Sequence, residues 1–183
     1  MQKPALTALV CLMFCTPFVL VALSYSALPS ELPVLHLGIG HTILWAPKSL
    51  FMVFRVPVMN LIHGLMAAVM LHRAPAFAIV ERRRSYANIF STLLFTIAIK
   101  SDLEGLDFFA PASPALQPYE HWIAPATLTC VLAGLGVAMI VGRKVPLPWP
   151  ELRLTVRDKI ALSGLFATYL AIVVASISLG HRV

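Results

Sequence analysis

The stretch ALTALVCLMFCTPFVLVALSYS, residues 5–26, contains no charged side chain and lies within an uncharged window from Pro4 to Ser30. A helix of about 20 mostly apolar residues spans a bilayer, whose hydrocarbon offers no water to unpaired backbone groups. The stretch therefore predicts a transmembrane helix. Lys3 and the small residues at 24–27 also suggest a cleavable signal peptide, but the apolar stretch is longer than a usual signal core. We favour a retained helix.

The composition of the whole chain points to the same class of protein. Of 183 residues, 59% are hydrophobic and only 12% are charged, whereas soluble domains have about 45–50% apolar and about 25% charged residues. These proportions exclude a soluble globular domain and a disordered chain. All three cysteines lie inside apolar runs, which argues against a disulfide-stabilised secreted domain.

Four more apolar segments follow, at about residues 49–71, 85–101, 125–141 and 160–179. The segment at 85–101 is short for a transmembrane helix, because the residues between Arg84 and Lys100 rise only about 22 Å as a helix. Either these two side chains reach the membrane surface, or the helix continues to about residue 110 with its acidic residues in a wetter place. We expect an all-α integral membrane helical bundle of about five transmembrane helices, forming one domain over residues 1–183.

The basic residues are distributed unevenly between the two sides of this arrangement. Ten of the fourteen fall on one side, namely Lys3, Arg73, Arg82, Arg83, Arg84, Arg143, Lys144, Arg153, Arg157 and Lys159. Connections rich in Lys and Arg stay in the cytoplasm, so we expect a multi-pass membrane protein with its N-terminus inside the cell and its C-terminus outside. This asymmetry explains the net charge of +6 without a nucleic-acid partner. The expected partners are the lipid bilayer and another membrane protein or further copies of the chain.

The connection between the first two helices, residues 28–48, is unusually apolar for a loop. Its three prolines and two glycines disfavour regular helix. We expect it to fold back onto the outer face of the bundle or to lie in the membrane interface, where tryptophan is enriched. Its candidate contacts for a ligand or partner are His36, His41, Trp45 and Lys48.

The residues Leu28-Pro29, Leu32-Pro33, Gly40, Trp45 and Lys48 resemble a loop of SdpI-type bacterial membrane proteins. In that family the loop joins the two helices of an N-terminal domain. The resemblance covers about residues 20–71. The family's histidine position holds Leu35, with His36 beside it, and the family's acidic turn is replaced by residues 41–44. The resemblance implies a non-enzymatic role in toxin immunity or envelope signalling, because the family is known for proteins that protect their host from a secreted toxin and sequester a repressor.

The second helix carries two ionisable residues on one face, Arg55 and His63. At 100° per residue, the same face holds four methionines, at positions 52, 59, 66 and 70. One interpretation is a ligand path or a soft-metal site, because thioethers and imidazole suit copper(I). The other is that methionine fills gaps between helices while His63 makes one hydrogen bond. We predict no metal site, because no two histidines have ligand spacing and Arg55 would oppose a bound cation.

Arg55 lies about 10 Å from Lys48 along the helix axis, which is too deep for full solvation. Burying a guanidinium without a partner is costly, so either it extends towards the surface, or it binds an anionic group or bridges to the third helix. Its candidate partners are Glu31, Asp102, Glu104 and Asp107.

The end of the third helix contains several charged residues. Lys100 and Glu104 are four residues apart and can pair on one helix face. Asp107 continues this face, and Asp102 lies between Lys100 and Glu104 in the sequence. One interpretation is proton or cation handling. The other is an ordinary solvated helix end.

The sequence shows no set of residues typical of enzymatic chemistry. It has no Gly-rich phosphate loop, serine nucleophile elbow or HExxH zinc pattern. Only His63 lies deep in a span, which argues against bis-histidine haem but leaves open a pigment or haem contact through a single histidine, so the sequence assigns no cofactor. The preferred hypothesis is a non-enzymatic SdpI-type protein. The alternatives are an accessory subunit of a larger membrane complex that contacts pigment, haem or quinone, and a transporter or metal-handling protein built on Arg55 and His63.

Overall fold

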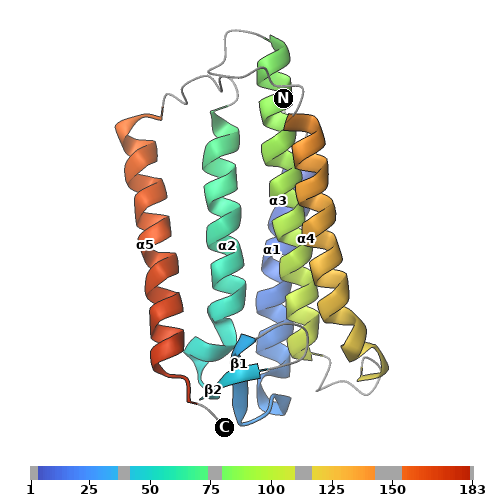
Figure 1. Ribbon diagram of the computed structural model, residues 1–183, viewed down its shortest axis with the longest axis vertical. Coiled ribbons are helices and arrows are strands. Elements are labelled where there is room, and N and C mark those ends of the chain that lie inside the picture. Colours follow the sequence, from blue (N-terminus) through green and yellow to red (C-terminus); the bar gives the residue numbers. More distant parts are fainter. Residues whose placement is uncertain (1–3, 37–41, 74–79, 110–116, 143–153, 182–183) are drawn as a thin grey trace.

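The computed structural model describes residues 4–36, 42–73, 80–109, 117–142 and 154–181. Five long helices run side by side in this part of the chain (Figure 1) and confirm the predicted all-α bundle: α1 (Pro4–Ser24), α2 (Leu50–His72), α3 (Val80–Phe109), α4 (Glu120–Gly142) and α5 (Val156–Ser178). The first helix begins at one end of the bundle and the last helix ends at the other (Figure 1).

Four of these helices are long and apolar enough to cross a membrane, at Ala8–Ala27, Leu50–His72, His121–Gly142 and Val156–Ser178. The protein is therefore a multi-pass membrane protein. The fifth, α3, contains more charged residues, but its 30 residues run along the others and contact α1, α2 and α4. Of the two alternatives for this segment, the structure shows the longer one, in which the helix continues past Lys100 almost to residue 110.

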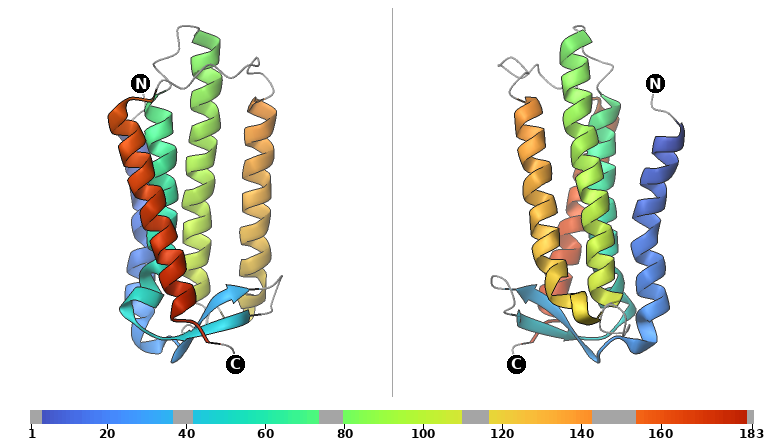
Figure 2. Two further views of the ribbon diagram at one scale, coloured as in Figure 1. Left: turned by 60° about the vertical axis from the view of Figure 1, so that its left-hand side comes forward. Right: turned by 90° about the vertical axis from the view of Figure 1, so that its right-hand side faces the viewer.

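The loop between α1 and α2 contains regular structure that the sequence analysis did not predict. After a short 3₁₀ turn (η1, Tyr25–Ala27), strands β1 (Glu31–His36) and β2 (Thr42–Pro47) pair as an antiparallel hairpin. The hairpin lies across one end of the bundle (Figure 2), here called the hairpin end. The prolines in this loop argued against strands in the sequence, because proline cannot donate a ladder hydrogen bond and within sheets is confined to edges and bulges.

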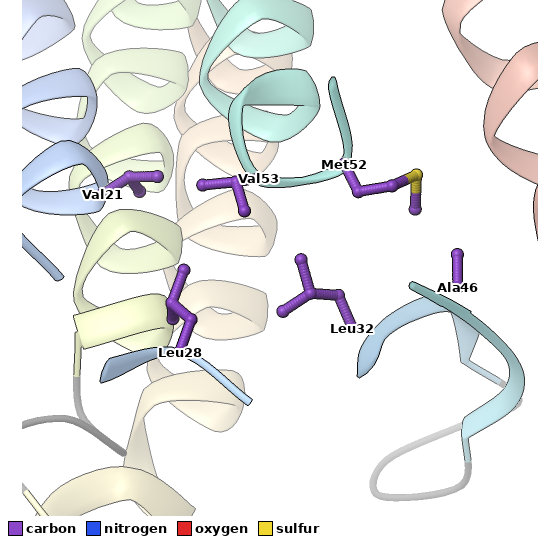
Figure 3. Packing of buried hydrophobic residues seen from close by; sticks show 6 residues of the cluster. All are labelled: Val21, Leu28, Leu32, Ala46, Met52 and Val53. Atoms are coloured by element: carbon purple, nitrogen blue, oxygen red, sulfur yellow. The ribbon is translucent and has the colours of Figure 1, made fainter. Parts of the chain in front are cut away.

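One face of the hairpin packs onto the helices. Leu32 and Ala46 are direct partners in the ladder, and both are almost fully buried. They close a cluster whose other members come from α1, from the turn after it and from α2, namely Val21, Leu28, Met52 and Val53 (Figure 3). The loop thus folds back onto the bundle, which is one of the two arrangements expected for it.

Small residues let the helices approach closely at two points. A Cβ atom on Gly64 of α2 would overlap the ring of Phe14 on α1, and one on Gly134 of α4 would overlap Thr96 on α3. By contrast, α5 packs mainly against α2, and only 6% of its span is buried inside the protein, compared with 44% of the α2 span. The two helices α2 and α3 therefore form the centre of the bundle.

Candidate functional site: polar side chains inside the bundle

Arg55 joins α2 to the hairpin. Its side chain is almost completely buried, with 7% of the residue exposed. Nη2 donates a hydrogen bond to the carbonyl oxygen of Pro33, and Nη1 lies 3.6 Å from the sulfur of Met52. The ladder register shifts between Pro33 and Leu35, and such an irregularity leaves backbone groups without a partner on the neighbouring strand.

These contacts differ from the two alternatives considered for Arg55, which were an extension towards the surface, and binding of an anionic group or a bridge to the third helix. The partners that the structure shows are a backbone carbonyl and a thioether. Among the candidate carboxylates, Glu31 lies beside His181 and Glu104 beside Lys100. The arginine thus holds β1 against α2, because a buried guanidinium needs acceptors and the hairpin supplies one.

Lys48 closes the base of the same loop. Its Nζ donates to the carbonyl oxygens of Leu28, at 2.8 Å, and Tyr25, at 3.4 Å, and lies 5.4 Å from the centre of the Tyr25 ring. Its backbone N–H donates to Ser30, and the next residue, Ser49, caps α2. Lys48 is therefore an internal tie between the end of α1 and the start of α2.

The C-terminal end of α5 is also bound to the hairpin. Trp45 and His181 exchange two backbone hydrogen bonds, of 2.9 and 2.7 Å, and Nε2 of His181 lies 3.4 Å from Oε1 of Glu31. No role was predicted for His181. Of the other loop candidates, His41 lies outside the described residues, and for His36 only the backbone is described.

A second set of polar side chains lies deep between α2 and α3. Nζ of Lys100 donates to Oδ1 of Asn60, at 3.0 Å, and to Oε1 of Glu104, at 2.6 Å, while Nδ2 of Asn60 donates to Oε2 of Glu104. Each side chain thus contacts the other two. This trio is here called the central polar cluster.

The central polar cluster lies halfway along the bundle. Asn60 is about 15 Å along the axis from Leu50 and about 18 Å from His72, and the bilayer hydrocarbon is about 30 Å thick. Asn60 is 2% exposed, whereas the side chains of Lys100 and Glu104 remain 29% and 27% exposed. Lys100 and Glu104 pair as their four-residue spacing predicts. Their contacts with Asn60 of α2 favour a polar site between helices over an ordinary solvated helix end.

His63 lies one turn further along α2, beside this cluster. Its ring packs against that of Tyr169 on α5, with centroids 4.7 Å apart and the planes tilted by 48°. The imidazole is within electrostatic range of Lys100 and Glu104. No group of three or more His, Cys, Asp or Glu residues in the described part of the chain could hold a metal ion.

The two other acidic candidates of α3 differ from each other in burial. Oδ1 of Asp102 is buried without a hydrogen-bond partner, and Asp107 is exposed closer to the hairpin end. Glu104 is thus the acidic residue of α3 for which the structure describes a contact with Asn60.

Two contacts in the bundle were missed by the sequence analysis. Asn60 was not singled out, although an amide in the middle of an apolar helix is itself a signal. At the other end of the bundle, Arg73 contacts Asp158 and donates to Oγ1 of Thr155, at 3.0 Å. The capping box of Thr155 and Asp158 at the start of α5 was the sequence signal there.

Comparisons of the chain with protein-family models, with curated proteins and with solved structures gave no match. The class defined by the fold is a multi-pass membrane protein with a hairpin across one end and a polar cluster at its centre. The contacts of these two features are the basis for assigning a function.

Proposed function

We propose that the protein is a non-enzymatic SdpI-type membrane protein of the bacterial cytoplasmic membrane, acting in toxin immunity or envelope signalling. The hairpin end is its recognition surface. One observation carries this proposal: the residues that resemble the family's loop, apart from Gly40, which lies outside the described residues, build one firmly attached element. Pro33 accepts from Arg55, and Lys48 donates to Leu28.

The hairpin offers a suitable surface for a polypeptide. Its inner face is buried against the helices, whereas Pro29, Ser30, Glu31 and Pro47 are exposed. A preformed surface binds at a lower entropic cost than a loop that must first be ordered. Such a surface suits recognition of a secreted toxin or of an envelope protein.

The proposed sidedness follows from charge. The arginines at the start of α3, residues 82–84, lie at the end of the bundle opposite to the hairpin (Figure 1). The positive-inside rule puts such residues in the cytoplasm, which leaves the hairpin outside. A cysteine introduced at position 83 of a cysteine-free variant should react with a membrane-impermeant maleimide only after the cells are opened. Labelling in intact cells would contradict this orientation.

The function is tested by protection assays with two matched variants. Cells lacking the gene, complemented with the parent or a variant, are challenged with culture supernatant from cells of the same strain. Trp45→Ala removes an aromatic side chain from the hairpin, and Trp122→Ala removes an exposed one from α4. We expect Trp45→Ala to lose protection and Trp122→Ala to keep it, at equal amounts in the membrane. Full protection by Trp45→Ala and by a variant with residues 42–46 scrambled would refute the role of the hairpin.

A second candidate is an accessory subunit of a larger membrane complex. It is favoured by the low burial of α4 and α5, whose spans are 11% and 6% buried inside the protein. Purification in a mild detergent discriminates between the candidates. Stable co-purification of another membrane protein supports a subunit, and a colourless monomer or homodimer argues against one.

A further inference from the structure

The central polar cluster occupies a place where charge is unfavourable. Lys100 and Glu104 contact Asn60 at the middle of α2, a helix apolar and long enough to cross a membrane, and ionisable side chains in such spans are expensive and mark functional sites. The contacts that attach the hairpin, made by Arg55 and Lys48, do not involve this cluster. Its chemistry is therefore separate from recognition at the hairpin end.

The hydrogen-bonding groups of the cluster bond to one another, except where Lys100 and Glu104 are partly exposed; this part is here called the open side. An ammonium group has three hydrogens, and the structure gives two of those on Lys100 an acceptor, on Asn60 and on Glu104. The side chains of the ion pair are 29% and 27% exposed. Hydrocarbon cannot accept the remaining hydrogen, so an acceptor of another kind fits the open side.

His63 lies three residues from Asn60 on α2, and Tyr169 belongs to α5. Their rings are in contact, and no hydrogen bond described for the structure uses a ring nitrogen of His63. The imidazole therefore provides a second polar group, and the two rings provide a flat apolar surface. This combination suits a ligand whose polar head adjoins a ring or a chain.

The other side of the α2–α3 pair is closed by α1. Gly64 of α2 lies against Phe14, and Gly105 of α3 lies against Pro17. In Figures 1 and 2, α4 and α5 lie on opposite flanks of the α2–α3 pair. The approach to the cluster is thus on the side of the pair that α1 does not cover.

The surroundings favour a ligand that is dissolved in the membrane. Beyond His63, α2 has no polar side chain in residues 64–71. Towards the hairpin, Arg55 is already engaged by Pro33. A water-soluble ligand would lack polar contacts on its way along α2, whereas a lipid can enter sideways from the bilayer. A bare cation fits less well, because Lys100 already balances the charge of Glu104.

We propose that Asn60, His63, Lys100 and Glu104 form a binding site for a membrane-dissolved lipid whose head group carries a hydrogen-bond-accepting oxygen. Lys100 and His63 donate to that oxygen, Asn60 and Glu104 hold the ammonium group in position, and the apolar part of the ligand remains in the bilayer. A quinone carbonyl and a fatty-acid carboxylate share this chemistry.

The test uses the purified full-length protein in lipid nanodiscs. Binding of decylubiquinone and of oleate is measured separately by isothermal titration calorimetry, against empty nanodiscs. The variant Asn60→Leu/Lys100→Met/Glu104→Met removes the whole cluster without leaving an unpaired charge, and His63→Phe keeps the ring but removes its nitrogens. Thr92→Val is the control, since the Thr92 hydroxyl bonds within its own helix.

We expect at least one probe to bind the parent and Thr92→Val equally. The triple variant should weaken its binding by about tenfold or more, as expected for a lost hydrogen bond to a charged group, and His63→Phe should weaken it less. The probe that binds identifies the class of head group. Absence of binding by both probes, or equal binding to the parent and to a folded triple variant, would overturn the proposal and leave the cluster as a structural tie between α2 and α3.

Discussion

Replacing Lys100 by methionine tests the central polar cluster most directly. Methionine keeps a long unbranched side chain in the helix but removes the ammonium group that donates to Asn60 and Glu104. The carboxylate of Glu104 then keeps only its hydrogen bond from Asn60. We expect the folded protein to be destabilised, because a carboxylate in the membrane interior loses its counter-charge.

The expected loss in the free energy of unfolding is about 2–3 kcal/mol. Hydrogen bonds to charged groups contribute about 1.5–3 kcal/mol each, and breaking a fully buried ion pair costs about 3–5 kcal/mol. The side chains of this pair are 29% and 27% exposed, so the loss falls below that range. Removing the whole cluster, in Asn60→Leu/Lys100→Met/Glu104→Met, leaves no unpaired charge and should restore stability to within about 1 kcal/mol of the parent.

The measurement is reversible unfolding in mixed micelles with increasing dodecyl sulfate, followed by far-ultraviolet circular dichroism. Thr92→Val is the matched control on the same helix, with an expected change within about 0.5 kcal/mol. The reasoning fails if Lys100→Met is as stable as this control. It also fails if the triple variant is less stable than Lys100→Met. The hydrogen bonds of the cluster would then stabilise the bundle beyond neutralising the charge of Glu104.

Three further predictions concern the packing and the ends of the helices. Arg55→Met removes the hydrogen bond to the hairpin, so amide hydrogen exchange in residues 31–36 should accelerate while exchange in α4 stays unchanged. Gly64→Leu should lower the unfolding temperature, because its Cβ atom would overlap a ring of α1, whereas Gly136→Ala has open space and should not. Thr155→Ala removes the cap of α5 and should cost about 1 kcal/mol in unfolding experiments.

Each of these has an outcome that contradicts it. Unchanged exchange in β1 after the loss of Arg55 would show that the hairpin is held by its apolar face alone. Equal unfolding temperatures for the two glycine variants would contradict the close approach of α1 and α2. A stable Thr155→Ala variant would mean that the start of α5 is held by other contacts, such as that between Arg73 and Asp158.

The features that sequence reasoning predicted are those that depend on neighbouring residues. An apolar run such as residues 5–26 must become a helix in the bilayer, because only intrahelical hydrogen bonds satisfy its backbone there. The i, i+4 spacing of Lys100 and Glu104 likewise allows their pairing within one helix. The function implied by the Leu28–Lys48 loop stays a prediction.

The tertiary structure alone decided which distant residues meet. Pro33 accepts a hydrogen bond from Arg55, although a proline within a strand weakens the strand pattern in the sequence. Asn60 joins Lys100 and Glu104 across two helices. These contacts depend on the rotation and depth of each helix, which are set by packing at positions such as Gly64. Hydrophobic length specifies that a helix crosses the membrane, but it does not specify which face the helix turns towards its neighbours.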